Sequence, residues 1–298
     1  MRLTFNADYS NSMADLDRTA ADLARWQRAV SSGRRIQVAS DDPAAMARVI
    51  TERGEMGSID RYVRAADSVS SRLSIVDTVV SDVITRITDA RATAASARGS
   101  EPTQSQRDAA AQALLEAKDA LLSDLNYTFR GSHLFSGSST TQAPYAKQAD
   151  GTVSAYQGDA QTVSVDVDRA RAVAVTFDGR ALAQGSEASD IFASLDGLVA
   201  AVRAGDDAGI QTGLQQLERA FDRAVAFQSS VGTQLASIDD QQNRLGELKQ
   251  ASTTLVSKDE DANMAEAVSK MTQAETAYRT ALAAIGARSK QTLLDYLQ

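Results

Sequence analysis

A heptad pattern of apolar residues, sustained over residues 59–97, constrains the fold of this chain more than any other feature of the sequence. In steps of alternately three and four residues, every position holds an apolar or aromatic side chain, and Ser, Thr, Asp or Arg fill most positions between them. The stripe consists of Ile59, Tyr62, Ala66, Val69, Leu73, Val76, Val80, Val83, Ile87, Ala90, Ala94 and Ala97. This spacing predicts a long helix that packs against other helices as in a coiled coil.

Further helical patterns lie on both sides of a region of different character. After Gly99 and Pro102, apolar residues at helical spacing predict a partner helix over 103–129, joined to the first as an antiparallel hairpin. Helical spacing returns near Ser189 and continues through a second long run that ends at Leu245, interrupted by Gln228 and Gln242. For these two glutamines we favour edge positions that face solvent over buried ones.

Between these regions, residues 131–186 lose the helical period. The segments SHLFS, TVSAY, TVSVDV and VAVTF alternate as β-strands do, and Gly, Pro and Asp-Gly pairs separate them. The predicted fold class is therefore mainly α: a long coiled-coil helix bundle formed by the N- and C-terminal parts, with a small inserted β-rich domain.

The two chain ends carry apolar stripes that are too narrow to be stable as isolated helices in water. Because each stripe needs a partner, the opposite end is the obvious candidate, and the two stripes form a predicted assembly interface. On the N-terminal side the interface comprises Tyr9, Met13, Leu16, Leu23, Trp26 and Val30. On the C-terminal side it comprises Met264, Met271, Tyr278 and Ile285.

A hinge and a helix cap separate the N-terminal helix from the rest of the chain. Gly33 in the sequence SSGRR breaks the helix, and the following IQVASDD is expected to run extended. Asp42 followed by Pro43 has the residue types of an N-cap and a first helical residue. The acidic run Lys258–Asp261 also precedes a helix. Capping explains both this run and Asp41–Asp42 better than metal binding does, because neither has the alternating ligands of a calcium loop.

Composition argues against several functional classes. The net charge of −8 and pI of about 4.8 disfavour nucleic acid as the main partner. With no cysteine and His133 as the only histidine, thiolate chemistry and a histidine-pair metal site are excluded. A Ser-His-Asp triad could be built only around His133, for which we favour a surface or structural role, and we predict neither enzymatic activity nor a cofactor or metal. We expect neither a cleaved signal peptide nor a membrane partner, since the N-terminus reaches Asp8 without an apolar run and no stretch could span a bilayer.

Two distant motifs make the chain resemble a known family. The stretch VSSGRRIQVASDDPAAMARVITERG, continuing into a long helix, resembles the N-terminal signature of bacterial flagellins and flagellar hook-associated proteins. The C-terminal stretch from NRLGELKQAS to SKQTLLDYL resembles the matching terminal signature. The resemblance covers roughly residues 1–135 and 190–298, and the order of elements also agrees.

Within that family, two elements resemble the branch that joins hook to filament more than flagellin itself. These are His133–Gly137 with Pro144–Tyr145, and the ending Ser289–Leu297, although Leu134, Ser136 and Thr292 depart from the usual pattern. The ending adds Leu293, Leu294 and Leu297 to the expected assembly interface.

The resemblance implies a secreted, extracellular structural subunit of the bacterial flagellum, exported unfolded by the type III route. Its implied partners are further copies in a ring or layer, the hook-side junction protein, flagellin and an export chaperone. The domains expected are a terminal assembly domain (1–40 with 264–298), a helical body (41–130 with 187–263) and an outer β-rich domain (131–186). Two alternatives are a short flagellin that forms the filament itself and a non-flagellar coiled-coil adhesin or secretion-system component.

Overall fold

A computed structural model of the chain describes residues 2–99 and 101–296, with side chains described for 10–99 and 101–287. The fold is mainly α, as predicted, with only small two-stranded sheets. The helices are α1 (Arg2–Ser32), α2 (Pro43–Ser96), α3 (Gln104–Leu125), α4 (Gly179–Ala183), α5 (Ile191–Ala204), α6 (Asp207–Glu260) and α7 (Met264–Tyr296). The strands are β1 (Thr128–Phe129), β2 (Ser132–His133), β3 (Ser164–Asp168) and β4 (Arg171–Ala174).

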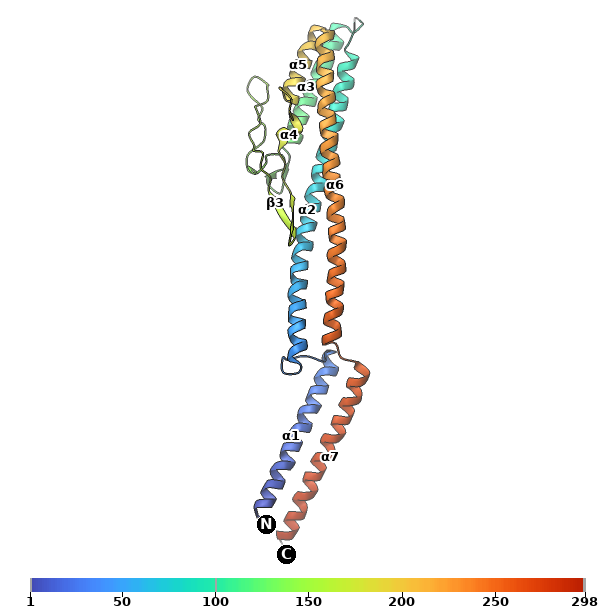
Figure 1. Cartoon of the computed structure of the whole chain (residues 1–298). Helices are drawn as coiled ribbons and strands as arrows, with labels where there is room; N and C mark the ends of the chain where they lie inside the picture. Colours follow the sequence, from blue (N-terminus) through green and yellow to red (C-terminus); the bar gives the residue numbers. More distant parts are fainter. Residues whose placement is uncertain (1, 100, 297–298) are drawn as a thin grey trace. The chain divides into compact units, whose positions relative to one another are not determined.

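The chain divides into two compact units, to which the long helices α2 and α6 both contribute (Figure 1). The terminal unit comprises residues 1–59 and 247–298, and the central unit comprises residues 60–246. Over the described residues, none of the helices combines the length and the apolar character that crossing a membrane requires.

The predicted apolar stripe of α2 forms the core of the central unit. Every stripe residue from Ala66 to Ala97 is buried, whereas Tyr62 is half-buried. These side chains join apolar residues of α3, α5 and α6, such as Leu121 and Leu195, in one continuous cluster, and Figure 1 shows the helices side by side. The heptad prediction is thus confirmed over residues 66–97.

The turn between α2 and α3 contains the residues that the sequence singles out. Gly99 adopts the left-handed conformation (φ 91°), and Thr103 starts α3 with a capping box: its side chain accepts the N–H of Gln106, whose side chain accepts the N–H of Thr103. The helix ends at Leu125, so the predicted end at 129 is wrong.

Asn126 explains the early end of α3. Its side-chain amide donates to the carbonyl oxygen of Tyr145 at 2.8 Å, and its side-chain oxygen accepts the N–H of Tyr145 at 3.1 Å. This pair of bonds to another segment stops the helix, and the chain turns into the β1–β2 hairpin. Helical spacing alone could not reveal this helix end, because Asn126 and Tyr145 lie 19 residues apart in the sequence.

The inserted region holds less regular β-structure than the sequence suggests. β1 pairs with β2 through a tight turn at Arg130 and Gly131, both with positive φ, and β3 pairs with β4 around a bulge. The predicted strand TVSAY is wrong, since Val153 forms only an isolated bridge with Lys147. The insert is held on the helices by aromatic side chains, together with ion pairs such as Lys147–Asp119 and Arg244–Asp168.

Two aromatic groups make this attachment. Tyr145 packs edge-on against Phe192 of α5, with ring centres 5.1 Å apart. Phe135 and Phe177 both contact Phe227 of α6, at 6.3 and 5.2 Å. Because these rings belong to the continuous core, residues 131–186 lie in the same compact unit as the bundle helices.

One glycine separates the helix that begins near Ser189 from the second long helical run. Asp190 caps α5 by accepting the N–H of Ala193, and Gly205 (φ 68°) ends that helix before α6 begins. On α6, Gln242 is half-buried and donates to Asp67 of α2 at 2.7 Å, while its neighbour Gln241 is the buried glutamine.

Candidate assembly interface

The terminal unit brings the two predicted stripes together, because α1 packs against α7 (Figure 1). On α1, the predicted residues Met13, Leu16, Leu23, Trp26 and Val30 are all half-buried. Among the side chains of α1 that the structure describes, the buried apolar one is the small Ala29. The N-terminal stripe is therefore covered only in part.

The C-terminal stripe is covered in a similar way. Met271, Tyr278 and Ile285 are half-buried, and Ala267 is buried, but Met264 is 45% exposed. The predicted interface residues Tyr9, Leu293 and Leu294 have side chains outside the described residues, and Leu297 lies outside them altogether. Two helices whose large apolar side chains stay half-covered gain less from their pairing than buried helices do.

The connection between α1 and α2 is built by Gly33 and two aspartates. Gly33 adopts φ 71°, and its N–H donates to the carbonyl of Ala29, which ends α1 in the manner of a C-terminal glycine. Asp42 accepts the N–H of Ala45 at 3.0 Å, so that α2 begins at Pro43 with the predicted cap geometry. The hinge and cap residues thus occupy the two ends of one loop, residues 33–42.

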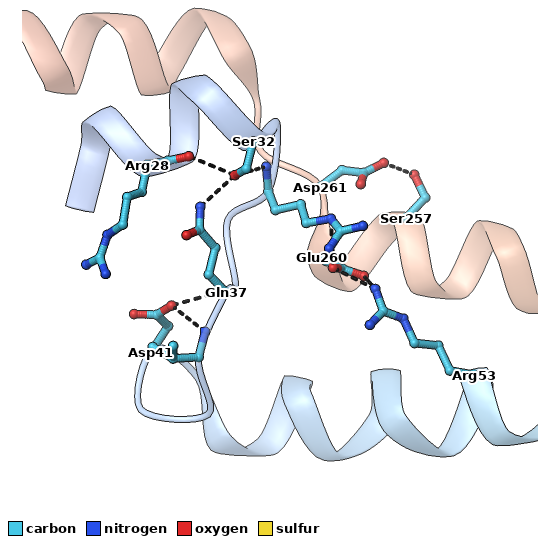
Figure 2. Close-up of polar contacts among 10 residues, drawn as sticks. Arg28, Ser32, Gln37, Asp41, Arg53, Ser257, Glu260 and Asp261 are labelled. Atoms are coloured by element: carbon cyan, nitrogen blue, oxygen red, sulfur yellow. Dashed lines mark hydrogen bonds and ion pairs between the residues drawn. The ribbon is translucent and has the colours of Figure 1, made fainter. Parts of the chain in front are cut away.

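Asp41 holds the middle of this loop. Its carboxylate accepts the backbone N–H groups of Gln37 (3.0 Å) and Val38 (3.1 Å), and these bonds hold its pKa below the ordinary value of 3.8. Residues 38–41 consequently form a turn, not the continuous extended segment that the sequence suggests. Ser32 fastens the loop to α1, since its hydroxyl accepts from the Gln37 side chain and donates to the carbonyl of Arg28 (Figure 2).

The α1–α2 loop is bonded to the other connection, between α6 and α7. The N–H of Arg35 donates to the carbonyl of Glu260 at 2.7 Å, and the N–H of Ala262 donates to the carbonyl of Gly33 at 2.9 Å. Arg34 and Asp261 thereby form a short antiparallel bridge. We call this assembly of residues 33–42 and 257–263, with Arg48 and Arg53 of α2, the joint.

Glu260 is the central residue of the joint. Although only 6% exposed, its carboxylate lies 2.6 Å from the guanidinium of Arg53 and 3.1 Å from that of Arg34 (Figure 2 shows the first pair). A buried carboxylate is costly unless it is paired, and here it is paired with both the loop and α2. Glu260 thus ties three segments of the terminal unit together.

Asp259 adds a second ion pair beside it. Its carboxylate accepts two bonds from Arg48, at 2.8 and 2.9 Å, and this contact holds the pKa of Asp259 below its ordinary value. Its carbonyl oxygen also accepts from Arg35 at 2.7 Å. Both acidic residues belong to the last turn of α6.

The sequence suggests that the acidic run caps the next helix, but in the structure it does not. Asn263 does so, since its side-chain oxygen accepts the N–H groups of Ala265 (3.1 Å) and Glu266 (3.4 Å). Sequence reasoning missed the arginine–carboxylate pairs. The signal was present, because two adjacent arginines follow Gly33 and two adjacent acids end the returning helix.

Outside the joint, the remaining candidates for chemistry are the single histidine and the side chains that could bind a metal ion. His133 is half-buried, with Nδ1 2.9 Å from the carbonyl oxygen of Asn126. Among the side chains that the structure describes, His, Asp and Glu nowhere gather in a group able to hold a metal ion. The terminal unit thus combines half-covered apolar stripes on α1 and α7 with a joint held by hydrogen bonds and ion pairs.

Comparisons with known proteins agree along most of the chain. Residues 4–140 match the family model described as the bacterial flagellin N-terminal helical region. The chain is 22% identical to flagellar hook-associated protein 3 of Escherichia coli K12, over 94% of this chain and 95% of that protein.

Two solved structures share the fold. The crystal structure of the flagellar junction protein FlgL from Legionella pneumophila superposes with a TM-score of 0.62 at 13% identity, covering 72% of this chain and all of that one. Xanthomonas campestris FlgL gives 0.61 at 17% identity, covering 69% and 99%. These likenesses extend the sequence match to three dimensions.

Proposed function

We propose that this chain, a relative of the bacterial flagellins and flagellar hook-associated proteins, is a structural subunit of the bacterial flagellum. In this role it forms an adaptor layer that joins the hook, through the hook-side junction protein, to the flagellin filament. The observation that carries the proposal is its similarity to flagellar hook-associated protein 3 along nearly the full length of both chains.

The geometry supports a non-enzymatic assembly role. The terminal unit carries a helix pair with half-covered apolar stripes, and such stripes gain stability when further chains cover them. We therefore assign the assembly interface to α1 and α7, with self-assembly into a ring or layer outside the cell. An export chaperone that shields these helices before assembly is part of the same proposal.

Deletion of the gene tests the adaptor role. Electron microscopy of the deletion strain should show hooks without filaments, and flagellin should accumulate in the medium, because filament subunits lack the layer on which they assemble. Expression of the intact chain should restore the filaments. Normal filaments in the deletion strain would overturn the proposal.

One observation favours a second candidate, a short flagellin, since the matched family model describes the flagellin N-terminal region. Position along the flagellum separates the two. Immunogold labelling of isolated flagella should give one spot at the distal end of the hook for an adaptor, and label along the whole filament for a flagellin.

A further inference from the structure

An open groove runs along one side of the terminal unit, between α2 and α6. It has a volume of about 620 Å³ and is lined by Ala47 and Thr51 from α2 and by Leu255 and Asp259 from α6. Leu255 is 49% exposed although it is large and apolar. Gly54 follows at the same helical spacing on α2, and a Cβ atom placed there would meet nothing within 4 Å. The α2 side of the groove thus presents small residues between the charged side chains of Arg48 and Glu52.

On α6, Leu255 lines the groove with Lys258 and Asp259, and a second leucine continues the same face of the helix. Leu248 lies seven residues before Leu255, which places both on one face of the helix, and it is 50% exposed. Small residues beside two leucines at heptad spacing form a surface into which another helix can pack its side chains.

Two unpaired charges border this groove. Glu52 of α2 and Lys258 of α6 both line it, and neither side chain forms an ion pair or hydrogen bond with the part of the chain that the structure describes. By contrast Arg48 and Asp259, their neighbours, bind one another. The groove therefore presents the acid Glu52 and the base Lys258 to a partner, with Lys258 beside the carboxylate that binds Arg48.

The outer face of α7 is an apolar surface of matching spacing. This face lies beside the stripe that packs against α1, and its apolar residues Met264, Val268 and Leu282 remain 43–45% exposed. Glu275 lies midway between Val268 and Leu282, seven residues from each, and is paired only within its own helix, with Arg279. This face too carries one acid and one base.

We propose that the groove of one copy binds the outer face of α7 from a second copy. The apolar rows match at heptad spacing, and the charges are complementary: Lys258 can pair with Glu275 of the second copy, and Glu52 with its Arg279. Because groove and face are different surfaces of one chain, the contact is head-to-tail and adds copies in a closed ring or open helix. This inference rests on the proposed structural role and names the contact that serves it.

Cysteine cross-linking in assembled flagella tests the contact, because the chain has no native cysteine. In full-length Leu255→Cys/Val268→Cys, mild oxidation should give covalent oligomers on a non-reducing gel, which a thiol reductant returns to monomers. The matched control is Val225→Cys/Val268→Cys, since Val225 is an exposed valine of α6 within the central unit. The control should remain monomeric.

The single variants decide between contacts. Dimers from Leu255→Cys alone would show that the groove faces a second groove, and this would overturn the proposal. Absence of oligomers in the double variant, in cells that still attach filaments, would overturn the contact and leave the adaptor role intact. Failure of the adaptor role is distinct, because the unmodified chain would then be absent from the hook end in immunogold images.

Charge exchange covers the case in which the cysteine variants assemble poorly. Lys258→Glu should lower the number of filaments per cell roughly threefold, the scale of one surface ion pair, and Lys258→Glu/Glu275→Lys should restore it. Lys249→Glu, on the same helix, serves as the control for added negative charge. If the double variant is no better than Lys258→Glu alone, the contact is wrong.

Discussion

The central and terminal units differ in how much of their apolar surface they bury. The central unit has a continuous core of Val, Leu, Ile and aromatic side chains. Among described side chains, the terminal unit buries only six apolar residues, three of them alanine: Ala29, Ile36, Ala45, Val49, Ile59 and Ala267. It nevertheless carries seven of the ten large apolar side chains that are exposed within residues 10–99 and 101–287: Val38, Ile50, Leu248, Leu255, Met264, Val268 and Leu282.

This difference indicates two sources of stability within one chain. Burial of large apolar side chains stabilises the central unit by itself. The terminal unit has few such contacts and is held instead by backbone bonds and arginine–carboxylate pairs at the joint. In the assembly role that we propose, polar bonds would specify the shape of this unit, and other copies would bury its exposed apolar side chains.

Removal of both chain ends should have the largest effect on assembly. A chain lacking residues 1–40 and 264–298 should remain a folded, soluble monomer, because the core of the central unit is untouched. It should not restore filaments to a deletion strain. Circular dichroism and size-exclusion chromatography measure the fold, and electron microscopy measures the filaments. An unfolded truncated chain would contradict the independence of the central unit.

The two units should respond differently to the same core-weakening substitution. Leu73 is fully buried in α2, so Leu73→Ala should lower the unfolding free energy of the protein by about 3 kcal/mol, the usual result for a buried leucine. Leu23→Ala in α1 should lose less than about 1 kcal/mol, since that side chain is half-buried. Urea denaturation followed by circular dichroism measures both. Equal losses would show that the terminal unit is as well packed as the central one.

Glu260→Gln should weaken the joint by about 1–3 kcal/mol, because Arg34 and Arg53 lose the charge that they share. The loss should be local, and hydrogen exchange should quicken at residues 33–42 and 261–263 while the core of the central unit stays protected. Asp15→Asn is the matched control, since the Asp15–Arg18 pair is exposed and should contribute little. Unchanged exchange at the joint would show that Glu260 does not hold it.

The difference between the units also sets how far the sequence predicts the structure. In the central unit the heptad stripe of α2 could be predicted residue by residue, because burial against other helices imposes its own period. The end of α3 could not, since it depends on Asn126 bonding to Tyr145. The joint was half-predictable: Gly33, Asp42 and Pro43 act within one loop, whereas Glu260 acts on arginines more than 200 residues away.

The insert illustrates the same limit. Its alternating segments indicated β-structure, but Val153 gained no strand partner beyond a single bridge. Its attachment comes from aromatic contacts such as Tyr145 with Phe192, which no local period reveals. Local spacing therefore predicts elements that are long and buried, and distant polar or aromatic contacts decide where short ones begin and end.

The smallest expected effect concerns the turn at Asp41. Asp41→Asn should cost about 1 kcal/mol at pH 7, because the ionised carboxylate accepts the N–H groups of Gln37 and Val38 better than an amide does. These bonds hold the pKa of Asp41 below 3.8, so its contribution is fully present above that pH and is lost as the pH falls through the folded-state pKa. The native chain should therefore approach the variant in hydrogen exchange at residues 37–41 as the pH is lowered from 5 towards about 2.

Asp150→Asn in the insert controls for general acid effects, since its bonds lie in the central unit and should leave the exchange of residues 37–41 unchanged. If the exchange rates of the native chain and Asp41→Asn still differ at low pH, the ionised carboxylate does not hold the turn. The stability of this loop would then be as independent of charge as that expected of the central core.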